Sequence, residues 1–318
     1  MRVPITLDLH ISNFTYPDVG PDKLFDKIVQ IATTAENSGF SSVSAMDHLH
    51  QIAPVGAPQN FMLDGSTILA GIAARTQKLT LGLLVGSVTY RNPAHAAKIT
   101  TTVDVISGGR AWHGIGAGWF EEEHKAYGFD FPGLGQRLAM EEEAIQIHRS
   151  LFTKDQTTFH GKYFQVENAY NNPKPVRGDI PILIGGSGEQ KTLGMVAKYG
   201  DGCNLFGDAD NAKRLLGVLA GHCEKLGRNY DDIQKTGMMQ IAIADTHEKA
   251  QAKLEILRRR GTAEQAIANT VVGTPDTIGE EAQKRRDAGL QGLTVGVPDN
   301  YDTETVEQVG KLLAPIFS

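Results

Sequence analysis

Short apolar runs alternate with amphipathic segments along the whole chain. The runs at 79–85 (LTLGLLV) and 180–186 (IPILIGG) are almost entirely apolar, which is typical of strands buried on both faces of a parallel sheet. Between such runs, apolar residues recur at helical spacing, as at Leu24, Ile28 and Ile31. Strands that are separated by helices pair in parallel, so this alternation predicts an α/β fold.

The pattern contains eight strand-like runs. They are expected at 3–9, 41–46, 79–85, 110–118, 180–186, 202–206, 238–244 and 293–297, with helices between them that include 67–74, 93–106 and 306–316. Eight such units in 318 residues fit a closed (β/α)8 TIM barrel better than an open doubly wound sheet. An excursion at about 157–179, with a hairpin around His160-Gly161, precedes the fifth strand. We therefore predict one barrel domain over residues 1–318 with this insertion.

Composition and charge narrow the class of protein. The chain is 41% hydrophobic and has a formal net charge of −6 with both signs dispersed. It has no apolar run of the roughly 20 residues that span a bilayer, no visible signal peptide, and no basic stripe or basic amphipathic helix. Cys203 and Cys223 are too few for a disulfide framework. These features predict a soluble, cytoplasmic protein whose partners are small molecules and neither nucleic acid nor membrane.

In barrels of this kind, the residues that follow each strand build the active site. These residues are His10, Ser12 and Asn13; Asp47, His48 and His50; Gly86, Ser87, Tyr90, Arg91 and Asn92; Gly116, Gly118 and Trp119; Gly185, Gly186, Ser187, Gly188 and Glu189; and Asn204, Phe206 and Asp208.

A metal site is one interpretation of the histidines. His48 and His50 are two residues apart, so on a strand they would share a face, with Asp8 and His10 close by. A catalytic metal needs three or four converging ligands, and the other strands end in Gly, Asn or Val-Pro. We therefore predict no metal, and we expect His10 and His50 to be solvated or hydrogen-bonded histidines.

Two strand ends are rich in glycine. In IGGSGEQ (184–190), backbone N–H groups before a helix can hold a phosphate, although the same residues can form a plain tight turn. In GIGAGW (114–119), glycines allow a flat ligand to approach the backbone. Together the two ends favour a phosphate-bearing ligand with a planar body across the barrel mouth.

Several longer segments carry a family pattern. They are SAMDHLH (44–50), TYRNP (89–93), ISGGRAWHGIGAGWFEEEHKAYG (106–128), RSLF (149–152), FHGKYFQV (159–166), PKPVRGDIPILIGGSG (173–188) and KYGDGCNLF (198–206). Together they resemble the bacterial-luciferase-like flavin and deazaflavin oxidoreductases, and within them the branch that uses coenzyme F420. The resemblance covers nearly the whole chain, and it implies a (β/α)8 barrel, an excursion before the fifth strand and a homodimer.

The resemblance also implies site residues. His48 would face the deazaflavin ring and assist proton transfer as the catalytic residue, unless it is a structural histidine bonded to Asp47. The segment 83–87 matches one that carries a non-proline cis peptide behind the ring. The remaining expected cofactor-binding residues are Asp47, Leu84, Val85, Gly86, Ser87, Asn92, Gly116, Gly118, Gly185, Gly186, Ser187 and Gly188. Asn92 and its neighbour Arg91 near the mouth can equally be plain solvated residues, and we expect the Glu189 side chain to point outward.

Hydride transfer between coenzyme F420 and a small organic substrate is the function that the resemblance implies. The alternatives are an FMN-dependent monooxygenase of the same superfamily, whose reduced flavin activates oxygen, and a non-catalytic cofactor-binding barrel. The substrate and the direction of hydride flow stay open.

The residue after the glycines of the fourth strand bears on the substrate. Related sugar-phosphate dehydrogenases carry an acidic residue there, whereas this chain has Trp119, whose indole has no proton that titrates in the working range. We therefore expect an apolar substrate beside Trp119, His10 and Asn13, unless Trp119 packs into the core against Phe120 and Tyr127. The three glutamates that follow, 121–123, are expected to face solvent or to cap a helix.

Overall fold

The computed structural model describes residues 5–318. A parallel sheet curves into a barrel with the strand order β3-β2-β1-β12-β10-β9-β8-β5-β4. The bounds of these strands are β1 (Leu7–Ile11), β2 (Ser42–Ala45), β3 (Thr80–Leu83), β4 (Gly86–Ser87), β5 (His113–Gly116), β8 (Ile182–Gly185), β9 (Gly202–Leu205), β10 (Gln234–Ile243) and β12 (Gly292–Gly296). A short strand, β11 (Val271–Gly273), pairs with β10 outside this order.

The barrel closes between its third and fourth strand positions. Leu81 of β3 bridges to Ala111 just before β5, and β4 pairs with β5 farther along. The third strand, expected at 79–85, therefore ends at Leu83, and a second piece, β4, follows a cis peptide bond between Leu84 and Val85. The predicted (β/α)8 barrel is confirmed, and the cis bond lies within the expected segment 83–87.

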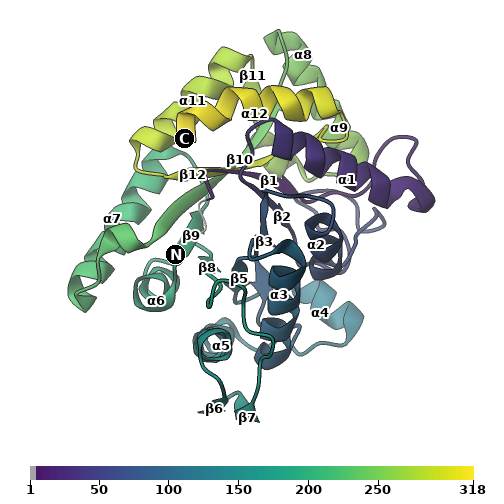
Figure 1. Ribbon diagram of the computed structural model, residues 1–318. Helices are drawn as coiled ribbons and strands as arrows, with labels where there is room; N and C mark the ends of the chain where they lie inside the picture. The colour runs from purple at the N-terminus through teal and green to yellow at the C-terminus, as the bar shows by residue number, and fades with distance from the viewer. Residues whose placement is uncertain (1–4) are drawn as a thin grey trace.

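Helices surround the strands (Figure 1). Their bounds are α1 (Pro21–Asn37), α2 (Gly65–Ala73), α3 (Pro93–Ser107), α4 (Glu121–Tyr127), α5 (Leu134–Thr153), α6 (Thr192–Tyr199), α7 (Ala209–Leu226), α8 (His247–Ala252), α9 (Leu254–Arg260), α10 (Glu264–Ala268), α11 (Pro275–Asp287) and α12 (Thr303–Phe317). Leu7 and Leu9 of β1 are fully buried in one core cluster with Ile28 of α1 and Val309 of α12. Because side chains alternate along a strand, Asp8 and His10 point the other way, into the barrel.

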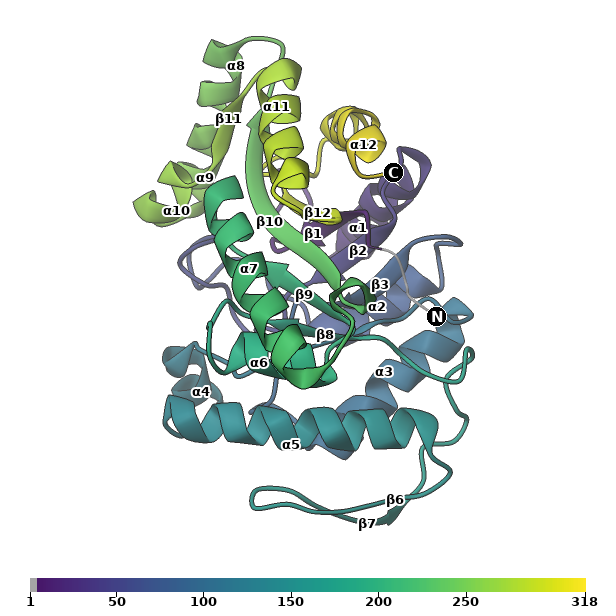
Figure 2. The ribbon, with the colours of Figure 1, turned by 90° about the vertical axis from the view of Figure 1, so that its left-hand side faces the viewer.

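The excursion before β8 is an antiparallel hairpin, as predicted. Its strands are β6 (Thr157–His160) and β7 (Gln165–Ala169), and Figure 2 shows the hairpin on the outer side of α5. It therefore lies away from the barrel mouth. Within the described residues, no helix is both long and apolar enough to cross a membrane.

Two strands differ from their predicted bounds in ways that affect the site. The first was expected at 3–9, of which residues 3 and 4 lie outside the described part of the chain. Its ladder with β2 extends to His10 and Ile11, which pair with Ser44 and Ala45. His10 is therefore a residue of the barrel wall and not of the following loop. The strand expected at 238–244 begins earlier, at Gln234, because its first residues pair with β9.

Candidate active site

Asp47 ties two strand ends together at the barrel mouth. Its carboxylate follows β2, is 4% exposed, and accepts a hydrogen bond from the backbone N–H of Ser87 at 3.0 Å. The same oxygen pairs with the Arg91 guanidinium at 2.6 Å. Arg91 also reaches Asp64 at 3.2 Å. Asp47 therefore fixes β4 against β2 and holds Arg91, and it is not the hydrogen-bond partner of His48.

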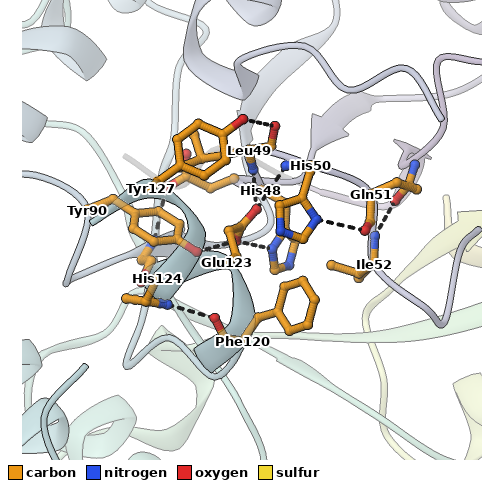
Figure 3. A network of polar contacts seen from close by, with 12 residues as sticks. His48, Leu49, His50, Gln51, Ile52, Tyr90, Phe120, Glu123, His124 and Tyr127 are labelled. Carbon is orange, nitrogen blue, oxygen red and sulfur yellow. Dashed lines mark hydrogen bonds and ion pairs between the residues drawn. The ribbon is translucent and has the colours of Figure 1, made fainter. Parts of the chain in front are cut away.

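His48 is paired with Glu123 instead. Its Nδ1 lies 2.8 Å from Oε2 of Glu123, and Figure 3 shows this carboxylate between the rings of Tyr90 and His48. The carboxylate also accepts hydrogen bonds from the Tyr90 hydroxyl and from the backbone N–H groups of Leu49 and His50. Four donors from two segments of the chain, the loop after β2 and the segment after β4, thus meet at this one side chain of α4.

The expectation that all three glutamates at 121–123 face solvent or cap the helix is wrong for Glu123. Glu121 and Glu122 are exposed, but Glu123 is fully buried. Burial by itself opposes its charge, yet the hydrogen bonds from His48, Tyr90, Leu49 and His50 outweigh burial and lower the pKa of Glu123 to about 2. The carboxylate is therefore ionised at neutral pH. It can only accept, so the Nδ1–H of His48 donates a hydrogen bond to it.

Trp119 stands beside this pair at the end of β5. Its ring centroid is 5.6 Å from that of His48 in an edge-on arrangement and 5.1 Å from that of Phe120. The side chain is 56% exposed, so the alternative in which Trp119 is part of the core is wrong. Tyr127, also exposed, stacks on His50 and donates a hydrogen bond to the Leu49 carbonyl at 3.0 Å.

His10 and Asn13 lie deeper than the sequence suggests. His10 is 4% exposed, and its Nδ1 contacts the Ser44 hydroxyl at 2.8 Å. Asn13 is buried, and its amide bonds the backbone of Thr15 in both directions, at 2.8 and 3.3 Å. Asn13 therefore shapes its own loop, whereas His10 belongs to the lining of the barrel.

Glycines at two strand ends make room for Val85. A Cβ on Gly185 would lie 2.6 Å from Cγ2 of Val85, and one on Gly116 would lie 2.8 Å from the same atom. Leu84 and Val85 are half-buried and pack against the cluster of Trp112 and Leu183. Gly116 and Gly185 therefore provide space first for this chain's own side chain, and the surface presented at the mouth is Val85.

Glycine is required at position 118 for a different reason. Its φ is +75°, in the left-handed region that favours glycine, and a Cβ there would lie 2.5 Å from the Ser87 hydroxyl oxygen. The Ser87 hydroxyl is hydrogen-bonded to the Thr89 hydroxyl at 2.7 Å. The Thr89 hydroxyl is in turn hydrogen-bonded to Nε2 of His124 at 2.6 Å. These two hydrogen bonds link β4 to α4, the helix that carries Glu123.

The loop after β8 has the features of an anion cradle. Among the described residues, no acceptor takes a hydrogen bond from the backbone N–H groups of residues 186–191. The Ser187 hydroxyl is buried and has no partner in the described chain, and Gly186 has a φ of +112°. Gly188 is exposed at the tip. As expected, Glu189 points outward, where it pairs with Arg214 at 2.6 Å.

The remaining predicted residues have local partners. Asn92 is exposed and caps α3, with its side-chain oxygen accepting from the Ala94 N–H at 2.9 Å. Gly86 is half-buried in β4 next to the Asp47 carboxylate. Over residues 5–318, no three or more His, Cys, Asp or Glu side chains are grouped so that they could hold a metal.

Comparison with known proteins gives the same architecture. Residues 9–301 match the family model of luciferase-like monooxygenases. The F420-dependent glucose-6-phosphate dehydrogenase of Rhodococcus hoagii (strain 103S) is 30% identical over 91% of this chain and 92% of its own length. The pyrimidine monooxygenase RutA of Stutzerimonas stutzeri (strain A1501) is 30% identical over 75% of this chain and 66% of its own length.

A solved structure of an F420-dependent secondary alcohol dehydrogenase, in complex with an F420-acetone adduct, superposes with a TM-score of 0.81. It covers 99% of each chain at 18% identity, which supports the fold. The family model covers most of this chain. The barrel of this chain has the same fold as the solved structure. The chain therefore belongs to the luciferase-like monooxygenase family.

Proposed function

We propose that this protein is a coenzyme F420-dependent oxidoreductase that transfers a hydride between the coenzyme and a small, apolar organic substrate. The observation that carries the proposal is the loop after β8, where the N–H groups of 186–191 and the Ser187 hydroxyl lack acceptors or partners in the described chain. Such a cradle suits a phosphate. The F420-dependent relatives indicate which phosphate-bearing cofactor to test.

The residues present fit that cofactor. The cradle would hold its phosphate, and Val85, with Gly116 and Gly185 around it, offers a smooth apolar surface for a flat ring. When bound, coenzyme F420 supplies a carbon centre that accepts or gives a hydride. The protein supplies position, exclusion of water and a proton.

We propose that His48 assists proton transfer at the mouth. Its Nδ1 is occupied by the ionised Glu123, so the ring presents Nε2 to the reacting groups. A buried carboxylate that accepts from Nδ1 fixes the tautomer and the orientation of the ring. Glu123 is therefore a positioning residue for His48.

An apolar substrate follows from the wall next to His48. Trp119 is 56% exposed at the mouth, and a large flat ring without a titratable proton favours stacking on apolar or aromatic molecules. The dehydrogenase relatives act, by name, on glucose 6-phosphate. We infer that this chain does not, because the side chain after the strand-four glycines is an indole and not a carboxylate.

The test is a substrate panel with the deazaflavin coenzyme under anaerobic conditions. The panel contains 2-cyclohexen-1-one, a nitroaromatic compound and a quinone with the reduced coenzyme, and glucose 6-phosphate with the oxidised one. We expect turnover with at least one of the first three and none with the sugar phosphate. Efficient oxidation of glucose 6-phosphate would contradict the substrate class.

An FMN-dependent monooxygenase is the second candidate, and the relative named as a pyrimidine monooxygenase is the reason to test it. The two functions differ in their use of oxygen. With reduced FMN, oxygen and a substrate, a monooxygenase consumes oxygen in step with product, whereas we expect no substrate-dependent oxygen uptake here. A protein that binds a cofactor but turns over nothing under either condition would be a non-catalytic cofactor-binding barrel.

We further expect a homodimer that works in the cytoplasm. Sedimentation equilibrium of the purified protein tests the first expectation, because a monomer of 34.4 kDa and a dimer are well separated in mass. Fractionation of the producing cells tests the second.

A further inference from the structure

Three polar residues inside the barrel wall form a continuous line that ends at the mouth. His10 and Asp8 of β1 point into the barrel, and Ser44 of β2 lies between them. Nδ1 of His10 is 2.8 Å from the Ser44 hydroxyl oxygen, which in turn is 2.6 Å from Oδ2 of Asp8. Since β1 pairs with β2 in the register His10↔Ser44, these contacts are fixed by the ladder itself.

The directions of the hydrogen bonds follow from the groups. With Asp8 ionised, its carboxylate only accepts, so the Ser44 hydroxyl donates to it. The Ser44 oxygen then accepts from Nδ1–H of His10. The neutral His10 ring therefore leaves Nε2 as a lone-pair acceptor. Nε2 makes no hydrogen bond with the described residues, and it is not among their fully buried unpartnered atoms, so it keeps some accessible surface. His10 lies near the end of β1, close enough to His48 at the mouth for the charge of His48 to act on it.

Nothing in the packing requires this line. Asp8 is fully buried, and its Oδ1 has no hydrogen-bond partner in the described chain. A buried carboxylate with an unused oxygen is costly, and apolar residues of similar volume are usually as good or better for stability. A site that retains such a group is a candidate for chemistry.

We propose that Asp8, Ser44 and His10 form a proton relay that opens to the mouth through Nε2 of His10 and exchanges protons there with the substrate, separately from His48. The relay has two complete states. In one, the protons lie on Nδ1 of His10 and on Ser44, directed toward Asp8. In the other, they lie on Nε2 of His10, on Ser44 directed toward His10, and on Asp8.

The chemistry balances with the proposed hydride transfer, on which this inference rests. The oxidised coenzyme, when bound, would accept the hydride from the carbinol carbon of an alcohol substrate, which would become a carbonyl compound. The hydroxyl proton passes to Nε2 of His10, the Nδ1 proton moves to Ser44, and the Ser44 proton moves to Asp8. When a carbonyl is reduced, every proton moves back.

The pKa values of Asp8 and His10 favour the binding of one extra proton by the relay. Burial raises the pKa of Asp8 to about 6, although the neighbouring hydroxyls, Ser44 first, oppose the shift. Burial, followed by the charge of His48, lowers the pKa of His10 to about 4. The proton therefore rests on Asp8 and not on an imidazolium. The strands paired with β1 bring no charge to this line, since β12 places Thr294 and Val295 opposite Asp8 and Leu9, and β2 places Ser44 opposite His10.

The relay is tested without cofactor by nuclear magnetic resonance, with histidine labelled in the ring and aspartate labelled in the carboxyl carbon. Between pH 8 and pH 5 we expect one midpoint, near the Asp8 value of about 6, at which Asp8 becomes protonated and His10 changes from the Nδ1–H to the Nε2–H form without becoming charged. In Ser44→Ala the His10 change at that midpoint is lost. Ser44→Thr, which keeps the hydroxyl, retains it.

A His10 ring that stays in one tautomer while Asp8 titrates in the wild type would overturn the relay. So would an unchanged response in Ser44→Ala. His160 on the exposed hairpin provides the control resonance, which should be the same in all variants.

Turnover of 2-cyclohexen-1-one with reduced coenzyme gives the second measurement. We expect Ser44→Ala to lower kcat by about 10- to 100-fold with KM little changed, and Ser44→Thr to recover most of the rate. Normal turnover in Ser44→Ala would overturn the relay and leave the proposed function intact. Failure of every variant to bind the coenzyme would overturn the proposed function, and the resonance experiment would still decide the relay.

Discussion

Nδ1 of His48 lies 2.8 Å from a carboxylate oxygen of Glu123, a residue 75 positions farther along the chain. The pairing joins the loop after β2 to α4, and the Tyr90 hydroxyl from the segment after β4 completes it. One buried carboxylate thus organises three of the loops at the barrel mouth, and two consequences can be measured.

The first consequence concerns stability. Replacement Glu123→Gln removes a charge that accepts from four donors, and we expect the free energy of unfolding to fall by about 1–3 kcal/mol at pH 7. The exposed Glu122→Gln is the matched control and should change it little. Urea denaturation monitored by circular dichroism measures both. Equal stabilities of the two variants would show that the Glu123 network contributes nothing.

The second consequence is that the stabilisation by Glu123 depends on pH. The folded pKa of Glu123, about 2, lies below its ordinary value of 4.5, so its stabilisation is complete above pH 4.5 and is lost as the pH falls toward 2. The difference in unfolding free energy between wild type and Glu123→Gln should therefore shrink as the pH falls from 4.5 toward 2. A difference that grows over this range would contradict the assignment.

The phosphate cradle predicts the effect of a charge at its tip. Gly188 is exposed, so Gly188→Glu should fold, but its carboxylate would face the proposed phosphate and weaken coenzyme binding by about 100-fold or more. Gly217→Glu on α7 adds the same charge where a side chain meets nothing within 4 Å. It should bind as the wild type does. Fluorescence titration of both variants locates the phosphate, and undiminished affinity in folded Gly188→Glu would move it elsewhere.

The Val85 pocket predicts a compensating pair of substitutions. In Gly185→Ala the new methyl would lie 2.6 Å from Val85, and such overpacking costs about 1–3 kcal/mol. The double variant Gly185→Ala with Val85→Ala should recover part of that loss, because the smaller side chain makes room. Thermal unfolding of the single and double variants measures the coupling. Additive losses would mean that the two residues do not share this space.

Trp119 predicts a loss of apolar substrates. Truncation in Trp119→Ala removes most of an exposed indole and should lower kcat/KM for 2-cyclohexen-1-one by about 10- to 100-fold, with coenzyme affinity changed less. Steady-state kinetics at saturating coenzyme separates the two effects. If turnover of every enone, nitro compound and quinone stayed unchanged, Trp119 would lose its role as the substrate wall.

The barrel could be predicted from the sequence because its strands are buried on both faces and its helices carry an apolar stripe. The hairpin after α5 was equally visible. The early end of the third strand was not visible in hydrophobicity, since the apolar run 79–85 continues past Leu83, where β3 ends. Family resemblance placed the cis bond within 83–87, and the structure puts it at Leu84–Val85.

The centre of the candidate site was predicted only in part. Glu123, like Glu121 and Glu122, was expected to face solvent or to cap the helix start. Glu123 is buried only because the loops after β2 and β4 bring their donors to it, which is a tertiary effect. His10 was assigned to a loop because the first strand was ended too early. The available signal was the alternation of Leu7, Leu9 and Ile11 with Asp8 and His10, which indicates a strand with a polar inner face.

Cofactor choice tests the account most directly. The purified protein is titrated separately with oxidised coenzyme F420 and with FMN, and binding is followed by fluorescence at equal ionic strength. The account predicts saturable binding of the deazaflavin coenzyme at micromolar or lower concentration and far weaker binding of FMN. Micromolar or tighter binding of FMN with no response to the deazaflavin coenzyme would contradict it and favour the monooxygenase.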